Sequence, residues 1–316
     1  MVSQLPHRPT HPKQATGRLA RPEPWSASYT APTHIKGLGL DSRQQSSYPL
    51  TMQPTPIYQP ANLNPAYQLR FSWTGFPARG TRFPANVSLD EMDELTAAWE
   101  SEGIRVLEHR WTAEQIQATL SVVPQVSPIF LAARVKGRLQ HAMRKRGQPV
   151  AFARNFSVRS LGDATREAVE NYVRRQVERA DLVDPAYREQ LRRCMWHDRA
   201  VDLSKPSNSS SALYWYNLHV VLISCERYRM GAKETAQTVR DTCRAVAAKH
   251  EYGISTLSVM PDHLHIAMRG NLAHSPEQIA LRLQNNTAWK LGQVKFWEHN
   301  YYAGTFGEYT MHAVRS

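Results

Sequence analysis

Residues 127–140 read SPIFLAARVKGRLQ, and residues 275–288, 148 positions further along, read SPEQIALRLQNNTA. Both stretches open with serine and proline and continue with apolar residues at helical spacing. A serine N-cap followed by proline in the first turn is a typical helix start. The two stretches therefore predict the same helix in two copies of a repeated unit, and the chain is best compared with itself first.

The repeat extends over most of the chain, because residues 157–172 also align with 302–314, with Gly162 on Gly307. The first half predicts strand 67–74, helix 88–101, strands 103–109 and 115–123, helix 127–145 and a strand near Phe156. The second half predicts strand 214–224, helix 232–250, strands 253–260 and 263–269, helix 275–290 and a strand near Tyr302. This β-α-β-β-α-β order is ferredoxin-like. We expect an α+β protein with two tandem ferredoxin-like domains, each with an antiparallel sheet, related by a pseudo-two-fold axis.

Composition sets the domain boundaries. Ten of the 20 prolines lie in residues 1–60, where no periodic apolar pattern occurs. Residues 1–62 are therefore expected to be a disordered basic tail, which is either a functionless extension or an arm that attracts phosphates. The first domain is expected over 63–180 and the second over 213–316. The polar segment 181–212 is expected to link them.

The balance of charges favours a polyanionic partner, since 39 Lys and Arg residues against 27 Asp and Glu give a net charge of +12. No long apolar run and no signal-peptide core occur, so we expect a cytoplasmic protein without a membrane partner. The three cysteines show no CxxC spacing. They are expected to be reduced thiols rather than disulfide partners or zinc ligands.

Two pairs of residues can carry chemistry. His263 and His265 are two apart on a predicted strand, so both imidazoles project from one face. Such a pair is either a binding site for a divalent metal ion or two histidines of the surface or core without a metal. Tyr172 and Gln176 are four apart on a predicted helix and share a face, which places a potential nucleophile beside a potential third ligand.

Four motifs carry a resemblance to a known family: LHVVLIS (218–224), MPDHLH (260–265), FWEHNYYAGTFG (296–307) and VENYVRRQ (169–176). Over 67–180 and 212–316 the chain resembles the single-tyrosine HUH transposases, which are the TnpA-like enzymes of the smallest insertion sequences and their REP-associated relatives. The resemblance implies that His263, His265 and Gln176 bind Mg²⁺ or Mn²⁺. It also implies that Tyr172 attacks single-stranded hairpin DNA, which is nicked and rejoined through a 5′-phosphotyrosine.

The departures from the family pattern predict that the first half supplies the tyrosine and the second half supplies the histidine pair. Gln115 and Gln117 stand where the first half would carry its own histidine pair, and the counterpart of Tyr172 would follow Ser316. We therefore expect one composite active site per chain, in an internal pseudo-dimer. A homodimer that exchanges its tyrosine helices and a decayed duplicate are the alternatives. A catalytically inactive, domesticated protein that binds hairpin DNA or structured RNA is the alternative function.

Two sets of residues are candidates for contact with the nucleic acid. The basic candidates are Arg134, Lys136, Arg138, Arg144, Lys145, Arg146, Arg227 and Arg229. They are either phosphate contacts or a solvated face. The aromatic candidates are Tyr214, Trp215, Tyr216, Trp297, Tyr301 and Tyr302. They can stack on unpaired bases, but at strand spacing about half of them are expected in the core.

Overall fold

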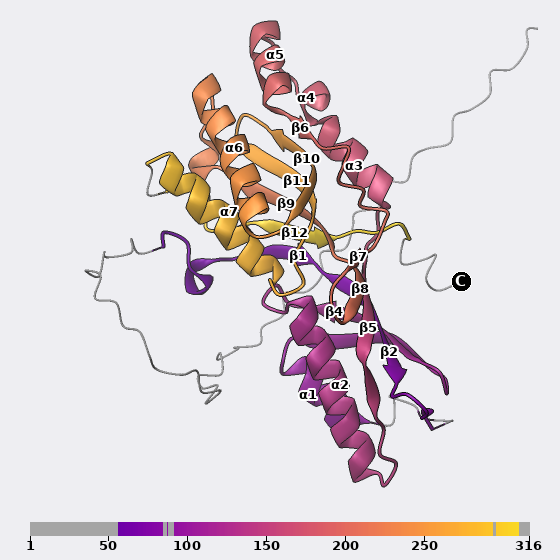
Figure 1. The fold of residues 1–316 in the computed structure, drawn as a ribbon. Coiled ribbons are helices and arrows are strands. Elements are labelled where there is room, and N and C mark those ends of the chain that lie inside the picture. Colours follow the sequence, from indigo (N-terminus) through magenta and orange to yellow (C-terminus); the bar gives the residue numbers. More distant parts are fainter. Residues whose placement is uncertain (1–55, 85–86, 88–91, 293–294, 310–316) are drawn as a thin grey trace, which may run out of the picture. The chain divides into compact units, whose positions relative to one another are not determined.

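Two six-stranded β-sheets organise the residues that this computed structural model describes, which are 56–84, 87, 92–292 and 295–309 (Figure 1). Sheet A contains, in spatial order, β1 (Ala66–Gln68), β12 (Tyr302–Thr305), β9 (Asn217–Ile223), β11 (His263–Arg269), β10 (Gly253–Val259) and β6 (Trp196–His197). Sheet B contains β7 (Ser207–Asn208), β8 (Ala212–Trp215), β5 (Phe152–Leu161), β2 (Arg70–Pro77), β4 (Ile116–Val122) and β3 (Ile104–Trp111). The chain divides into the units Met1–Pro49 and Leu50–Ser316, and every described residue lies in the second.

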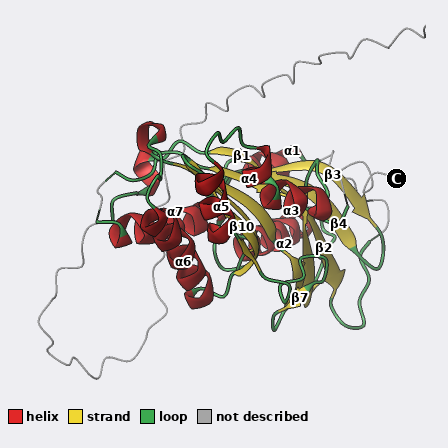
Figure 2. Ribbon diagram, turned by 90° about the horizontal axis from the view of Figure 1, so that it is seen from above, coloured by secondary structure: helices red, strands yellow, loops and turns green. Residues whose placement is uncertain are grey.

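Helices cover both faces of sheet A (Figures 1 and 2). The helices α6 (Lys233–Lys249) and α7 (Pro276–Lys290) share a core with the apolar face of the sheet, and α3 (Arg166–Arg174) packs on the opposite face. On sheet B, α1 (Asp93–Glu100) and α2 (Pro128–Lys145) pack on the apolar face. The alternation of apolar and polar residues along the strands decides which face each helix covers.

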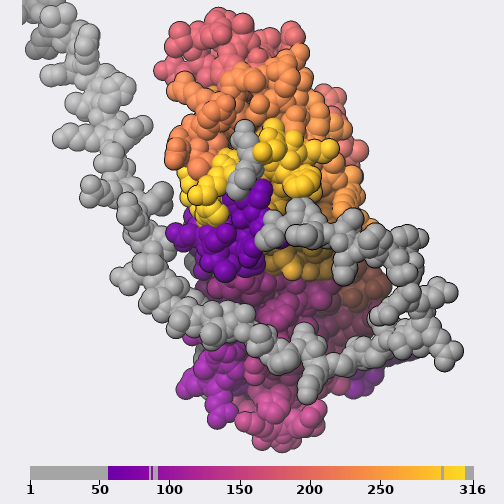
Figure 3. All heavy atoms as spheres, turned by 90° about the vertical axis from the view of Figure 1, so that its left-hand side faces the viewer, coloured from indigo at the N-terminus to yellow at the C-terminus, as the bar shows by residue number. Residues whose placement is uncertain are grey.

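Each half of the chain adds a short strand to the sheet of the other half. The strand β1 belongs to sheet A and pairs in parallel with β12, while β2, which follows after Leu69, belongs to sheet B. In the same way β8 pairs in parallel with β5 in sheet B, and β9, which follows after Tyr216, belongs to sheet A. Figure 3 shows the first described residues, in indigo, against the C-terminal ones, in yellow. The strands predicted at 67–74 and 214–224 are thus each two strands.

Two hydroxyl groups hold the points where the chain changes sheets. Ser160 Oγ on β5 accepts a hydrogen bond from the backbone amide of Asn217 at 2.9 Å. Thr305 Oγ1 on β12 accepts one from the backbone amide of Arg70 at 2.8 Å. Each hydroxyl therefore satisfies an amide at the start of the strand that has just left the neighbouring sheet.

Most predicted elements are confirmed. The helices expected at 127–145, 232–250 and 275–290 are α2, α6 and α7, each within one residue of the prediction. The helix expected at 88–101 is α1 from Asp93 onward, and residues 88–91 lie outside the described residues. The fold class is α+β, as expected. None of the described helices is long and apolar enough to cross a membrane.

The segment 181–212 differs from the open linker that its polar composition indicated. It contains α5 (Pro185–Cys194) and the edge strands β6 and β7, one in each sheet. Asp184 caps α5 by accepting from the amide of Ala186 at 2.8 Å, and the helix buries Leu191 and Cys194. A capped helix with an apolar stripe packs against its neighbours instead of remaining a flexible connection.

The expected tail also ends earlier than its composition indicated. Residues 1–55 lie outside the described residues, but Tyr58 is buried and Pro60–Asn62 form a 3₁₀ helix. The Tyr58 hydroxyl donates to the carbonyl oxygen of Trp297 at 2.8 Å. One buried aromatic side chain with a satisfied hydroxyl is enough to attach this segment to the folded chain.

Candidate active site

Helix α3 carries Tyr172 of the first half onto sheet A, which is built mostly from the second half. The helix begins after the N-cap Thr165, whose side chain accepts from the backbone amide of Ala168. Val169 and Val173, four residues apart, are buried on the side that faces the sheet. The side chain of Tyr172 is 40% exposed at the rim of this contact. The helix pattern therefore brings the tyrosine to the sheet surface without burying it.

Polar contacts fix the register of α3 on the sheet. Glu170 is buried, accepts a hydrogen bond from the Ser255 hydroxyl of β10, and pairs with Arg166 at 2.6 Å. Ser258, also on β10, donates from its hydroxyl to the carbonyl oxygen of Val173 at 2.6 Å. Because a buried carboxylate needs such partners, these contacts hold the helix in one position.

Three histidines lie on the face of sheet A beneath α3. His263 and His265 project from β11 with ring centroids 4.8 Å apart, as their two-residue spacing predicts. His219 projects from the adjacent strand β9 and stacks on His265 with centroids 5.3 Å apart. His219 Nε2 and His265 Nδ1 are joined by a hydrogen bond of 3.1 Å. The sequence prediction missed His219, although it lies in the strand motif LHVVLIS and alternation places it on the histidine face.

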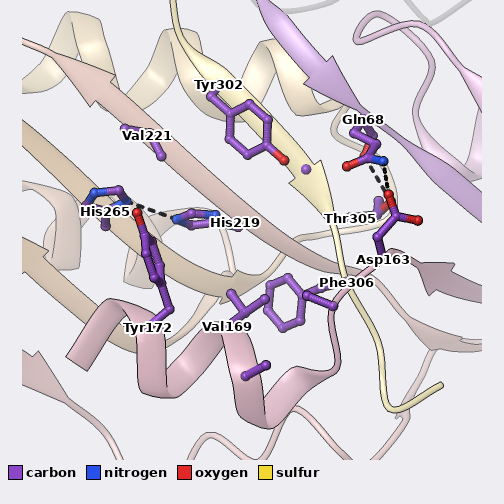
Figure 4. A pocket seen from close by; sticks show the side chains of 13 residues that line it. Gln68, Asp163, Val169, Tyr172, His219, Val221, His265, Tyr302, Thr305 and Phe306 are labelled. Atoms are coloured by element: carbon purple, nitrogen blue, oxygen red, sulfur yellow. Dashed lines mark hydrogen bonds between the residues drawn. The ribbon is translucent and has the colours of Figure 1, made fainter. Parts of the chain in front are cut away.

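Tyr172 meets two of these histidines, His265 and His219, within one chain (Figure 4). Its ring stands edge-on to His265, with centroids 5.5 Å apart and an interplanar angle of 90°, and its centroid lies 5.9 Å from that of His219. The guanidinium carbon of Arg179, on the short helix α4 (Gln176–Arg179), lies 5.4 Å from the centre of the tyrosine ring. The structure therefore brings together the tyrosine of one half and the histidine pair of the other.

An acidic side chain supports His263 from behind. His263 Nδ1 and Asp262 Oδ1 are 2.6 Å apart, and Arg227 pairs with the other oxygen of Asp262 at 3.0 Å. Burial raises the pKa of Asp262, but the hydrogen bonds from His263 and Arg227 outweigh burial and lower that pKa. Asp262 thus engages Nδ1 of His263, and Nε2 is the ring nitrogen that remains for another partner.

The histidine face fits a divalent metal ion chemically. Burial lowers the pKa of His265 to about 3 and that of His219 to about 4, and the neighbouring imidazoles add to the effect on His265. Both rings are therefore neutral near pH 7, as a metal ligand must be. Hydrogen bonds engage the Nδ1 atoms of His263 and His265, which is the usual support of metal-bound imidazole. Among the described residues, no group of three or more His, Cys, Asp or Glu side chains is arranged to hold a metal.

Gln176 supplies an amide near this site but not in one straight helix with Tyr172. The helix breaks at Arg175, so Gln176 begins α4, and its side chain is only 9% exposed. Its Nε2 donates to the carbonyl oxygen of Tyr172 at 3.1 Å. This bond orients the amide plane of Gln176, and the lone pairs of its Oε1 atom are the ones that could bind a metal ion.

The predicted basic contacts fall into two groups, of which the first lies on and directly after α2. Four residues of this first group already have protein partners. Arg134 and Arg138 pair with Glu102, Lys145 pairs with Glu94, and Lys136 donates to the carbonyl oxygens of Ala153, Arg154 and Asn155. Arg134 and Arg138, with Gly137 and His141, line a cavity of about 360 Å³ on the outer side of α2. Arg144 lies in the last turn of α2, and Arg146 is its C-cap.

The second group, Arg227 and Arg229, lies in an exposed loop beside Asp262. The backbone of this loop is unusual, because Glu226 and Arg227 adopt left-handed conformations with φ of 53° and 55°. Tyr228 between the two arginines is 61% exposed. Of the aromatic candidates, Tyr216, Trp297 and Tyr301 are in the core, while Tyr214, Trp215 and Tyr302 are partly exposed.

Part of the chain that includes most strands of sheet A resembles a known protein family. Residues 212–316 match the sequence profile of a family described as "Transposase IS200 like". The match supports the transposase family and covers His219, His263 and His265, but it does not reach Tyr172. No curated protein matches the chain.

Proposed function

We propose that the protein is a metal-dependent DNA transposase or strand transferase that nicks and rejoins hairpin-flanked single-stranded DNA through a 5′-phosphotyrosine on Tyr172. The observation that carries this proposal is the contact of Tyr172 with His265, at 5.5 Å between ring centroids within one chain. A tyrosine from outside the matched region thus stands against the histidine face inside it.

Tyr172 and the ends of the DNA account for the covalent steps. The phenol oxygen bonds to phosphorus while the bond between phosphorus and the 3′ oxygen breaks. The phenol proton is released, and the 3′ oxygen takes up a proton. The phosphotyrosine conserves the energy of the phosphodiester, so another 3′ hydroxyl can displace the tyrosine without ATP. Arg179, 5.4 Å from the tyrosine ring, offsets negative charge as the phenol loses its proton.

Within this proposal, His263, His265 and Gln176 would hold Mg²⁺ or Mn²⁺ through their Nε2 and Oε1 atoms. Such an ion, when bound, polarises the scissile phosphate and offsets charge in the transition state. Asp262 and His219 orient the two imidazoles through the bonds described above. The basic loop with Arg227 and Arg229 and the arginines of α2 are the proposed phosphate contacts, and the net charge of +12 supports that role.

The same proposal treats the chain as a tandem duplication with one active site. Sheets A and B share the strand order when β8, β5, β2, β4 and β3 are placed on β1, β12, β9, β11 and β10. Both β3 and β10 also carry a register shift at the same place, between Val106 and Glu108 and between Ile254 and Thr256. These likenesses support two HUH-like domains of ferredoxin-like type, of which only the second carries the histidine pair, His263 and His265.

The first experiment tests for covalent nicking. Labelled single-stranded hairpin oligonucleotides are incubated with the protein and Mn²⁺ or Mg²⁺ and separated on a denaturing gel. We expect a nick and a protein adduct on the 5′ phosphate, no reaction of duplex DNA, and loss of both products in Tyr172→Phe. A nick that survives Tyr172→Phe would remove the tyrosine from the mechanism. Hairpin binding without any nick would favour the inactive binding protein.

The second experiment counts the active sites. A Tyr172→Phe chain and a His263→Gln chain are mixed, and nicking is measured. Because Tyr172 meets the histidines of its own chain, neither variant holds a complete site and we expect no recovery. Recovered nicking would show that two chains exchange their tyrosine helices and that the working unit is a homodimer.

A further inference from the structure

A cavity of about 550 Å³ opens beside Tyr172 (Figure 4), and His263 is not among the residues that line it. Residues of α3, β9, β11 and β12 form its walls, with His265 of β11 among them, and Gln68 of β1 and the exposed Asp163 lie at one end. Its volume lies within the range of about 300–1,000 Å³ that is usual for small-ligand sites. The nucleophilic side chain is thus part of the wall of an unassigned cavity.

The walls of the cavity are largely apolar and include aromatic rings. Val169 and Phe306 lie on one side and the rings of His219 and Tyr302 on the other (Figure 4), and Ala168 also lines the cavity. The Tyr302 ring extends along its own strand over Gly304. A Cβ atom at residue 304 would collide with that ring, so the glycine is what allows the ring to lie flat. Aromatic rings and aliphatic side chains in the walls fit an aromatic ligand that stacks on them.

The end of the cavity at Gln68 and Asp163 is polar, and both side chains carry acceptor oxygens. Gln68 Nε2 donates to Asp163, and Arg70 pairs with the other carboxylate oxygen of Asp163 at 2.7 Å. Burial and the charge of Asp163 raise the pKa of Tyr302, whose hydroxyl lies toward this end (Figure 4). The carboxylate and the amide oxygen of Gln68 accept hydrogen bonds, and Arg70 balances the charge of the carboxylate.

We propose that this cavity binds one nucleobase, that of a nucleotide next to the scissile phosphate, with its faces against the aromatic and aliphatic walls and its edge toward Gln68 and Asp163. The inference rests on the proposed function only in placing the scissile phosphate at Tyr172. An acceptor-rich end selects bases that carry an exocyclic amino group, so cytosine, adenine and guanine are preferred over thymine.

The test uses photo-crosslinking in the Tyr172→Phe background, where the covalent chemistry is absent. The probe is a single-stranded 20-nucleotide oligonucleotide that contains 5-iodocytosine, and the adduct is located by mass spectrometry. We expect the adduct on Tyr302. Ala168→Leu, which places a larger side chain in the cavity from an exposed helical position, should lower its yield about 10-fold, since stacking of one base is worth about 1–3 kcal/mol.

The matched control is Asn171→Leu, an exposed position on the same helix that does not line the cavity. It should leave the yield unchanged. Unlabelled oligo(dC) should also compete better than oligo(dT), and Asp163→Asn should remove that difference. An adduct elsewhere, equal yields in Ala168→Leu and the parent, or equal competition by the two oligonucleotides would overturn the proposal. If the adduct forms on Tyr302 but the parent protein with Tyr172 does not nick DNA, the proposed function would be overturned, while the binding of a nucleobase in this cavity would still be supported.

Discussion

Sheets A and B place the same hydrogen bond at corresponding positions but make it from different residues. In sheet A, His265 on β11 is bonded to His219 on β9 at 3.1 Å. In sheet B, Gln117 on β4 is bonded to Ser72 on β2 at 3.0 Å. The strands pair in the same register at both places, since His265 lies opposite Val221 and Gln117 opposite Thr74. The backbone geometry of the site therefore exists twice, while the imidazoles occur on one sheet.

This difference shows that the strand geometry is the same in both sheets although the side chains at the corresponding positions differ. An amide and a hydroxyl maintain the polar surface of a sheet as well as two imidazoles do, because each donor still has an acceptor. They are weaker ligands for a catalytic divalent ion. Helix α3 packs on sheet A, where the histidines are. The composite site thus results from the position of one helix and the identity of a few side chains.

The largest expected effect comes from making sheet A resemble sheet B. His265→Gln should lower metal-dependent nicking by more than about 100-fold, since loss of even a supporting group around a metal costs about 10–100-fold. Gln117→Ala should leave nicking within about two-fold, because its sheet has no such ligand to lose. The measurement is the initial nicking rate on a denaturing gel. Equal damage from the two changes would show that sheet B contributes to the reaction.

A smaller effect is expected at the partner of His265. His219→Ser copies the residue of sheet B and should weaken Mn²⁺ binding about 10–100-fold, because His265 loses the bond that orients it. Calorimetric titration with Mn²⁺ measures this directly. His219→Asn retains a polar side chain beside His265 and should recover part of the affinity. Ser72→Ala is the matched control in sheet B, and a loss of affinity there would contradict the comparison.

The smallest effect tests whether the two halves are held together in equivalent ways. A Cβ atom on Gly162 would collide with the carbonyl oxygen of Thr305, and one on Gly307 with that of Ser160. Because backbone cannot move aside cheaply, Gly162→Ala and Gly307→Ala should each lower the free energy of unfolding by about 1–3 kcal/mol. Urea denaturation measures it. Gly137→Ala, with open space around its Cβ, is the control and should not destabilise the protein. Unequal losses at the two glycines would break the equivalence.

The sequence predicted the elements better than their partners. The helix starts at Ser127 and Ser275 were evident because a capping serine and a first-turn proline act locally. The exchange of β1 and β8 between the sheets was not evident, since one continuous strand pattern runs through Leu69 and Tyr216. Likewise, the polar composition of 181–212 predicted a linker and gave no indication of the helix α5. Strand pairing is a long-range choice that local patterns do not encode.

By itself the sequence determined the face that His263 and His265 share, the presence of Gln115 and Gln117 instead of histidines at the corresponding positions, and the repeated order of helices and strands. These features depend on spacing along one element, and the periods of strand and helix are constant. Only the tertiary structure decided that Tyr172 lies against His265, that His219 supports that ring, and that a cavity opens beside them. Each of these requires side chains from elements far apart in the chain, and their meeting depends on which sheet a helix buries its apolar face against.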